Sequence, residues 1–262
     1  YILGAEGLLF ALKASTGEQL WQKSLVKEFG SDVPKWGFST SPLVEEQLLL
    51  VEAGGVDGNV FVDMVIDRSA KATAVALDKT TGRTVWTALD NKMSYSSPIA
   101  YSVNGSRQIA FINAYALVGL AVEDGSELWR FPWKTRWDVS AATPVFMPPD
   151  RIFISSGDNG AVVRVGADGV NEVWKNSEMK NHFGTSIHLD GHLYGFDKSI
   201  LKCIDADSGE ERWKARGYAK GTLIAAADHL IVLGERGNLG LVHATPDRFA
   251  EKANVPLMRG RC

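Results

Sequence analysis

Five segments of the chain repeat one pattern of apolar and polar residues. Each segment has an apolar run, a polar stretch that contains glycine, and a second run that ends in tryptophan. The tryptophans recur at intervals of roughly 40 to 65 residues, which indicates a repeat architecture. In the fourth segment the glycine lies one residue further from the tryptophan, which predicts an extra residue in that turn. The pairs are Gly17 and Trp21, Gly82 and Trp86, Gly125 and Trp129, Gly169 and Trp174, and Gly209 and Trp213.

The polar stretch of each segment predicts the turn of a β-hairpin. In the second segment the apolar run 73–77 is followed by Asp78, three polar residues, Gly82 and the run that ends at Trp86. Aspartate bonds neighbouring backbone N–H groups, and glycine adopts a positive φ without steric cost, so this spacing favours a turn. Alternation along the next strand then puts Trp86 on the opposite face from its two neighbours.

Two further extended runs lie between successive hairpins. Each repeat of about 40 residues therefore predicts four short antiparallel strands, which is typical of a β-propeller whose neighbouring blades cover each other. We predict an all-β chain that forms a β-propeller of four-stranded antiparallel blades. The first runs lie at 40–44, 96–100, 142–146, 185–187 and 222–224, and the second runs at 48–51, 109–113, 152–155, 192–196 and 229–233.

The ends of the chain and one insertion depart from the regular repeat. We expect a single β-propeller domain over residues 1–262 that is incomplete, because residues 1–21 and 221–262 look like partial repeats. Residues 245–253 carry a helix-start signal, Thr-Pro-Asp, and are expected as a short helix or a turn. Residues 52–72 form an insertion, expected as a long loop or an elaborated hairpin on one face.

Composition and charge restrict the classes of function. The 28 basic and 31 acidic residues give a formal charge of −3, which does not suit non-specific binding to nucleic acid. No run reaches the ~18–20 apolar residues of a transmembrane helix. Two cysteines, Cys203 and Cys262, are too few for a disulfide-rich scaffold. We expect Cys203 to be buried and unreactive and Cys262 to be exposed.

The segment Ala-Leu-Asp-x-x-Thr-Gly-x-x-x-Trp at 76–86 resembles the repeat of the pyrroloquinoline-quinone-type propellers. This bacterial family includes quinoprotein alcohol dehydrogenases and the propeller lipoprotein of the outer-membrane β-barrel assembly machinery. The resemblance extends from 7–12 to about Leu241. Family members usually have about seven or eight blades, and five to six are represented here. The resemblance implies a periplasmic or secreted protein of the cell envelope, whose membrane association would come only from an anchor upstream of Tyr1.

Two classes of function remain open on this basis. The first is a non-enzymatic scaffold that binds a protein or peptide partner through loops on one face, with no catalytic residue and no metal ligand. The alternative is part of a quinoprotein dehydrogenase that oxidises an alcohol or sugar with pyrroloquinoline quinone and Ca²⁺. Dehydrogenases of the family hold Ca²⁺ through carboxylate and amide oxygens, and their alcohol dehydrogenases place a Cys-Cys pair over the quinone. This chain has no Cys-Cys pair, and its aspartates lie chiefly in hairpin turns, so we predict no cofactor.

The aromatic residues separate into two groups. The repeat tryptophans are expected to pack between blades, with a stacking box for a cofactor as the alternative. Trp36, Trp133 and Trp137 lie outside the repeat and beside basic residues such as Arg136, so they are candidates for cation–π recognition of a ligand, with ordinary loop packing as the alternative. His182, in an interblade loop, completes the candidates for binding on the loop face.

Overall fold

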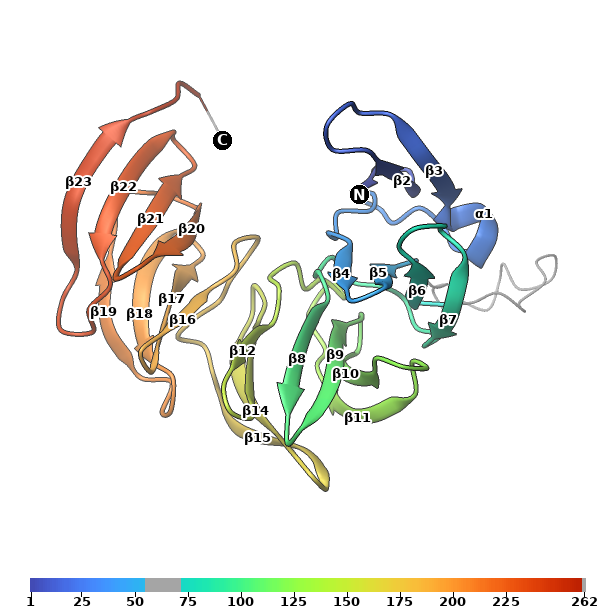
Figure 1. Ribbon diagram of the computed structural model, residues 1–262. Coiled ribbons are helices and arrows are strands. Elements are labelled where there is room, and N and C mark those ends of the chain that lie inside the picture. The colour runs from blue at the N-terminus through green and yellow to red at the C-terminus, as the bar shows by residue number, and fades with distance from the viewer. Residues whose placement is uncertain (55–71, 261–262) are drawn as a thin grey trace. The chain divides into compact units, whose positions relative to one another are not determined.

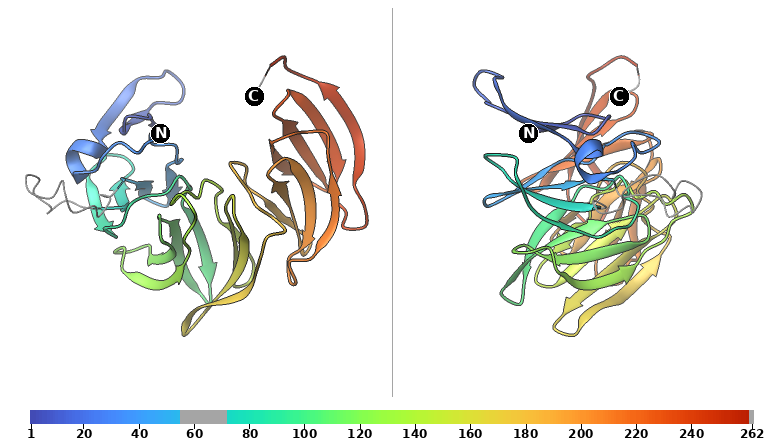
Figure 2. Two further views of the ribbon diagram at one scale, coloured as in Figure 1. Left: turned by 180° about the vertical axis from the view of Figure 1, so that it is seen from behind. Right: turned by 90° about the vertical axis from the view of Figure 1, so that its right-hand side faces the viewer.

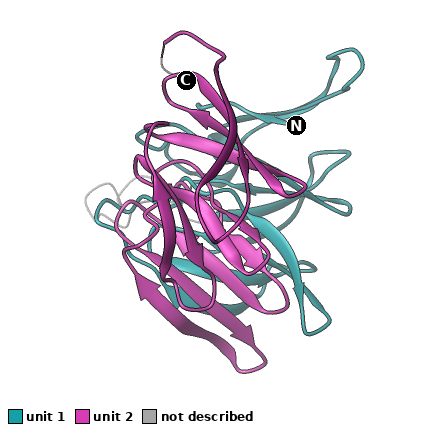
Figure 3. Cartoon of the chain, turned by 90° about the vertical axis from the view of Figure 1, so that its left-hand side faces the viewer, with its two compact units in different colours: residues 1–140 teal, residues 141–262 magenta. Residues whose placement is uncertain are grey.

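The computed structural model describes residues 1–54 and 72–260, and these residues are almost entirely β-strand. They divide into two compact units, unit 1 over Tyr1–Ser140 and unit 2 over Ala141–Cys262 (Figure 3). Over the described residues, each unit contains three antiparallel sheets in which strands adjacent in sequence lie side by side (Figures 1 and 2). Five sheets have four strands and one has three, so the predicted all-β chain of four-stranded antiparallel blades is confirmed.

Unit 1 holds the three-stranded sheet and two four-stranded sheets. Helix α1 follows the first sheet, and in each described sheet the order of strands is the order in sequence. The elements are β1 (Ile2–Leu3), β2 (Leu8–Leu12), β3 (Gln19–Ser24), α1 (Leu25–Phe29), β4 (Leu43–Glu45), β5 (Leu48–Glu52), β6 (Ala74–Asp78), β7 (Thr84–Ala88), β8 (Ile99–Val103), β9 (Ser106–Ile112), β10 (Ala116–Ala121) and β11 (Glu127–Pro132).

Unit 2 holds three four-stranded sheets with the same simple topology. The elements are β12 (Val145–Met147), β13 (Arg151–Ser155), β14 (Gly160–Gly166), β15 (Gly169–Asn176), β16 (Ile187–Leu189), β17 (His192–Asp197), β18 (Ile200–Asp205), β19 (Glu211–Ala215), β20 (Gly221–Ala226), β21 (His229–Gly234), β22 (Asn238–His243) and β23 (Ala250–Pro256).

Apolar cores lie between neighbouring sheets within each unit. In unit 1 one core joins Leu9 of β2 to Leu49 of β5, and a second joins Leu50 of β5 to Phe111 of β9. In unit 2 equivalent cores lie between the first and second sheets and between the second and third sheets. A strand such as β5 therefore contributes to two cores with alternate residues, and each buried side chain stabilises the fold by about 1.5–3 kcal/mol.

Residues 221–256 form a complete sheet, where the sequence suggested a partial repeat. The expected helix or turn at 245–253 is instead a short loop followed by β23, which pairs along β22 from Asn238↔Pro256 to His243↔Ala250. The Thr-Pro-Asp signal is local, because the Thr245 hydroxyl accepts a hydrogen bond from the Asp247 N–H at 3.3 Å. A helix here would leave the outer N–H and C=O groups of β22 without partners.

Three other details become visible only in the structure. The partial repeat expected at residues 1–21 contributes to a sheet of three strands, one fewer than the other described sheets. The fourth hairpin has a short turn, because Gly166 pairs directly with Gly169 and the extra residues lengthen the ladder of β14 and β15. Helix α1 was not predicted, since five residues are too few for a helical period. Its Ser24 N-cap and Gly30 C-cap (φ +61°) were the available signals. Of the insertion 52–72, residues 55–71 lie outside the described residues, as does Cys262.

Candidate functional site

The strands of every four-stranded sheet have two chemically different ends. Because antiparallel strands alternate in direction, the first-to-second and third-to-fourth hairpins lie at one end, which we call the turn end. The second-to-third connections and the loops that lead to the next sheet lie at the other, the loop end. Repeat tryptophans pack near the turn end, whereas the candidate binding residues outside the repeat lie at the loop end.

At the turn end, four repeat tryptophans reach from one sheet to the next within their unit. The indole N–H of Trp86 donates to the Val122 carbonyl at 2.9 Å, and its ring lies against Gly125, where an added Cβ would come within 2.5 Å. Trp21, Trp174 and Trp213 donate in the same way to the carbonyls of Lys79, Ala206 and Thr245. We call this contact the tryptophan clamp. It satisfies the indole N–H while the ring covers the turn of the next sheet.

The glycine of the clamped turn meets two structural requirements, a positive φ and the absence of a side chain. Gly82, Gly125 and Gly209 all have φ between +72° and +75°, and the tryptophan ring of the preceding sheet leaves no room for a side chain. Only glycine meets both conditions without strain. The third sheet of unit 2 lacks this glycine, and there Phe249 packs against Trp213 with ring centroids 5.6 Å apart.

Trp129 departs from the clamp. Its indole N–H donates to Gln108 Oε1 at 2.9 Å in its own sheet, and the same oxygen accepts from the Tyr101 hydroxyl at 2.9 Å. Across the ladder Trp129 pairs with Gly119, where an added Cβ would lie 2.1 Å from the ring. The other four repeat tryptophans pair with Ala11, Ala76, Val162 and Cys203. The missing side chain at Gly119 therefore allows the ring of Trp129 to fold over its own sheet.

The aspartates of the turns are engaged locally. Asp78 Oδ1 accepts from the N–H groups of Thr80 and Thr81 and from the Thr81 hydroxyl, and these bonds lower the pKa of the Asp78 carboxyl. Asp205 repeats this turn with Asp207 and Ser208. Cys203 is buried on β18, and burial raises the pKa of its thiol to about 12.

At the loop end of unit 1, exposed aromatic side chains surround a hollow of about 320 Å³. Trp36 is 60% exposed and Trp137 is 73% exposed, while Tyr95 meets Trp36 edge to face at 5.5 Å between ring centroids. Lys35 lies over the Trp36 ring at 5.0 Å, and Arg136 lies over Trp137 at 5.4 Å. The hollow thus offers apolar ring surface within a charged rim.

Buried hydrogen bonds fix the loops that carry these rings. The Ser140 N–H donates to Ser94 Oγ at 2.7 Å, and the Ser94 hydroxyl donates back to the Ser140 carbonyl at 2.9 Å. Trp133 is buried, and its indole N–H donates to Ser140 Oγ at 3.2 Å. Of the three tryptophans outside the repeat, Trp133 therefore positions the loop while Trp36 and Trp137 face solvent.

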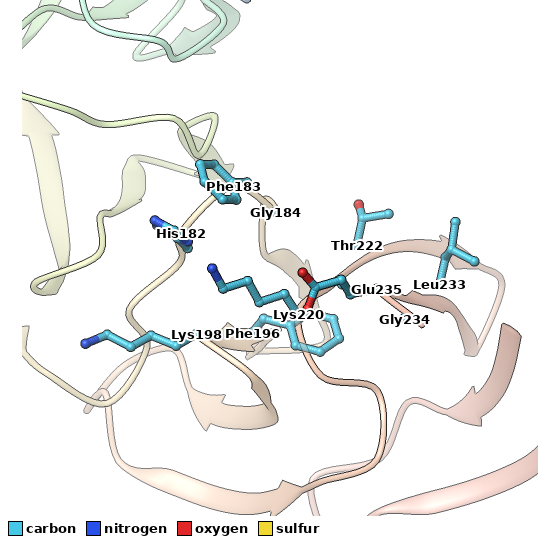
Figure 4. A pocket seen from close by; sticks show the side chains of 11 residues that line it. His182, Phe183, Gly184, Phe196, Lys198, Lys220, Thr222, Leu233, Gly234 and Glu235 are labelled. Atoms are coloured by element: carbon cyan, nitrogen blue, oxygen red, sulfur yellow. The ribbon is translucent and has the colours of Figure 1, made fainter. Parts of the chain in front are cut away.

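At the loop end of unit 2, a hollow of about 350 Å³ lies between the second and third sheets (Figure 4). His182 and Phe183 form one wall, with ring centroids 3.8 Å apart, and Phe183 is 65% exposed. Lys220 extends beneath the Phe183 ring, with its Nζ 5.4 Å from the centroid. Partial burial, Lys220 and Lys198 together lower the pKa of His182, so the imidazole is predominantly neutral at pH 7.

The His182 loop is held from below by Asn181 and Asp197. Asn181 is buried, donates its side-chain amide to the Phe196 carbonyl at 3.0 Å, and accepts from the Ser186 hydroxyl at 2.9 Å. Asp197 forms ion pairs with Lys180 at 3.5 Å and with the buried Lys202 at 3.2 Å. The structure therefore positions His182 and Phe183 on a rigid base.

Sequence reasoning located part of both hollows. Trp36 and Trp137 line the unit 1 hollow with Arg136 stacked beside them, and His182 lines the unit 2 hollow. Tyr95, Phe183, Lys198 and Lys220 were missed. Phe183 directly follows His182, which was an available signal, whereas Lys198 and Lys220 approach it only through the fold.

Within residues 1–54 and 72–260, no group of three or more His, Cys, Asp or Glu side chains is arranged to hold a metal ion. Within the same residues, no helix has the length and apolar character needed to cross a membrane.

Comparison with known proteins identifies relatives at the level of family and fold. The family described as outer membrane protein assembly factor BamB matches residues 1–215. BamB from Moraxella catarrhalis superimposes with a TM-score of 0.68 at 14% identity, over 98% of this chain and 72% of that one. Saccharomyces cerevisiae Sqt1 gives 0.70 at 10% identity, over 99% and 70%. The computationally designed Ika8 protein gives 0.59 at 11% identity, over 99% and 84%. No curated protein matches the sequence. These likenesses confirm the β-propeller fold.

Proposed function

Because the chain belongs to the family of the outer membrane protein assembly factor BamB, we propose that it is a non-enzymatic propeller scaffold of the bacterial cell envelope, periplasmic or secreted. It binds a protein or peptide partner through the loop end of its blades. The partner contacts the unit 1 hollow, where Trp36 and Trp137 provide the apolar anchor surface.

The observation that carries the proposal is the exposure of two tryptophans around one hollow. Large apolar side chains gathered at the surface of a soluble protein mark interaction sites, and tryptophan is enriched among the residues that contribute most to binding. Trp137 stands on a loop that the buried hydrogen bonds between Ser140 and Ser94 hold in place. The loop of Trp36 is held beside it by the Phe38 N–H, which donates to the Ala5 carbonyl at 2.9 Å. A rigid aromatic surface loses little conformational entropy on binding, so it suits recognition of an extended peptide.

Selection of peptides tests this proposal without requiring the identity of the partner. A phage-displayed random peptide library is selected on the full chain, and enriched peptides are measured on a Trp36→Ala/Trp137→Ala variant. We expect affinity to fall about tenfold or more, since each anchor contributes over 1 kcal/mol. Val85→Ala, which truncates an exposed apolar residue near the turn end, is the control and leaves affinity unchanged. Failure to enrich any peptide, or equal binding to both variants, contradicts the proposal.

The proposal includes no quinone cofactor. Asp78 and Asp205 accept hydrogen bonds from their own turns. Four of the five repeat tryptophans pack on neighbouring turns, and Trp129 packs on its own sheet. Incubation with pyrroloquinoline quinone and Ca²⁺ followed by gel filtration provides a direct test. We expect the quinone absorbance to separate from the protein, and co-elution in stoichiometric amount would favour the dehydrogenase alternative.

A further inference from the structure

The unit 2 hollow has a different chemistry from the unit 1 hollow. Its rim carries Lys198, Lys220 and the neutral His182, with Glu235 as the acidic residue among its lining residues. Phe183 provides an exposed ring, and Phe196 and Leu233 line the hollow from β17 and β21. The hollow therefore combines apolar surface with an excess of one positive charge.

The two lysines of the hollow differ from the lysines packed beneath it. Lys180 and Lys202 both form ion pairs with Asp197, and Lys202 also pairs with Glu178 at 3.1 Å and Glu211 at 3.0 Å. Lys198 and Lys220 have no carboxylate within ion-pair distance among the described residues, and Lys220 instead lies over the Phe183 ring. Their charge is thus available to a ligand.

Backbone contacts hold Lys198 and Lys220 at the opening. The Lys198 N–H donates to the Lys180 carbonyl at 3.1 Å, and the Glu235 N–H donates to the Lys220 carbonyl at 2.6 Å. Lys198 has a φ of +57°, a left-handed conformation that its tight β17–β18 turn imposes. The ammonium groups therefore start from fixed backbone positions, which lowers the entropic cost of binding an anion.

We infer that the unit 2 hollow binds an acidic peptide segment, with an aspartate or glutamate carboxylate on Lys220 and Lys198 and an apolar side chain against Phe183. The inference rests on the proposed scaffold function and specifies the chemistry of the segment bound at unit 2. Electrostatic complementarity favours this segment, because a carboxylate here replaces water around two unneutralised ammonium groups. Glu235 opposes it and limits how many carboxylates the hollow accepts.

Fluorescence anisotropy with a defined probe tests the inference. The probe is a fluorescein-labelled peptide of aspartate and glutamate around one phenylalanine, and the reference peptide replaces each acid by its amide. We expect Lys220→Glu to lower the affinity for the acidic peptide by about tenfold or more and Lys220→Arg to retain it. Lys252→Glu makes the same change of charge on the exposed strand β23 and serves as the control. Glu235→Gln should strengthen binding.

A histidine titration separates binding in the hollow from general attraction of charge. Burial, and after it the charges of Lys220 and Lys198, lower the pKa of His182. A carboxylate bound to the two lysines should raise that pKa, which NMR of the His182 ring measures in the full chain. Equal loss of affinity in Lys220→Glu and Lys252→Glu, or an unchanged His182 pKa at saturation, overturns the inference. Preference for vesicles of anionic phospholipid over the peptide also overturns it. The proposed function stands in those cases if the Trp36→Ala/Trp137→Ala variant loses its selected peptides.

Discussion

Tryptophan serves opposite purposes at the two ends of the blades. At the turn end, Trp86 is 8% exposed, bonded through its indole N–H and packed on the glycine of the next sheet. At the loop end, Trp137 is 73% exposed beside a hollow. The difference is set by what surrounds each ring, since a repeated turn supplies a carbonyl and a bare glycine, whereas a loop supplies neither. The repeat tryptophans stabilise the fold, whereas Trp36 and Trp137 keep exposed rings, which form the surface of the proposed partner site.

The largest expected effect comes from removal of a clamp. Trp86→Ala should lower the free energy of unfolding by about 3–5 kcal/mol, the usual cost of emptying a large aromatic site in a core. Trp137→Ala, the same substitution at the loop end, should cost less than about 0.5 kcal/mol. Urea denaturation monitored by circular dichroism measures the free energy of unfolding of both variants. Similar losses for the two variants would contradict the division between the ends.

Substitution of the turn glycine separates the contribution of the tryptophan contact from that of the backbone conformation. Gly125→Ala should cost about 2–3 kcal/mol, because the new Cβ meets the Trp86 ring and the backbone has φ +74°. Gly17 has the same φ of +74° with no neighbouring atom within 4 Å, so Gly17→Ala measures the backbone cost alone, about 1 kcal/mol. Equal losses would mean that the ring contact contributes nothing to stability.

Gly119→Ala tests why Trp129 lies on its own sheet. The added Cβ overlaps the ring and should displace it from Gln108, at a cost of about 2 kcal/mol. We expect a red shift of tryptophan fluorescence as the indole meets water. Ala76→Gly, at the equivalent register position opposite Trp86, is the converse change. An unchanged emission spectrum in Gly119→Ala would show that another residue directs the ring.

The buried carboxyl of Glu52 gives the smallest effect and a dependence on pH. Glu52 is fully buried near the loop end of β5, and among the described residues its oxygens have no hydrogen-bond partner. Burial raises the pKa of Glu52 well above its ordinary value. Below about pH 4.3 the Glu52 carboxyl is protonated in both the folded and the unfolded chain, so its burial costs no stability through ionisation. As the pH rises above this value, Glu52 ionises in the unfolded chain but stays protonated in the folded chain. The folded state therefore loses stability.

Glu52→Gln removes that ionisation. The variant should gain about 1–2 kcal/mol relative to the natural chain at pH 7, and the gain should shrink as the pH falls to about 4. Thermal unfolding across this pH range measures the difference. A difference that does not vary with pH would show that Glu52 is not the group responsible.

The sequence predicted the repeated part of the molecule well, because the turn chemistry is local. The spacing from Asp78 to Gly82 and Trp86 is sufficient to place a hairpin and the opposed faces of its strands. It does not specify where an indole packs. Trp86 and Trp129 occupy the same position of the repeat, but the residue paired with the ring is Ala76 in one sheet and Gly119 in the other. That difference depends on register, which became visible only in the folded sheets.

The candidate sites were predicted less completely. Trp36, Trp137 and His182 were recognisable as residues outside the repeat. Trp36 and Trp137 line the unit 1 hollow, and His182 lines the unit 2 hollow. Lys220 joins His182 across more than thirty residues of sequence, through the packing of two blades. Strand β23 was missed because its sequence, Ala-Glu-Lys-Ala-Asn-Val-Pro, lacks the apolar alternation of a half-buried strand. It is a strand because its backbone pairs with the edge of β22.

Site-specific photo-crosslinking in the cell envelope tests the central claim most directly. A photoreactive amino acid replaces Trp36, Trp137 or Phe183 at the loop end, and Leu20, Val85 or Leu128 in the matched set, each of which directly precedes a repeat tryptophan and is exposed. The division between the two ends predicts adducts with a discrete protein partner from the first set and none from the second. Adducts that form equally from both sets, or only from the second, would contradict it.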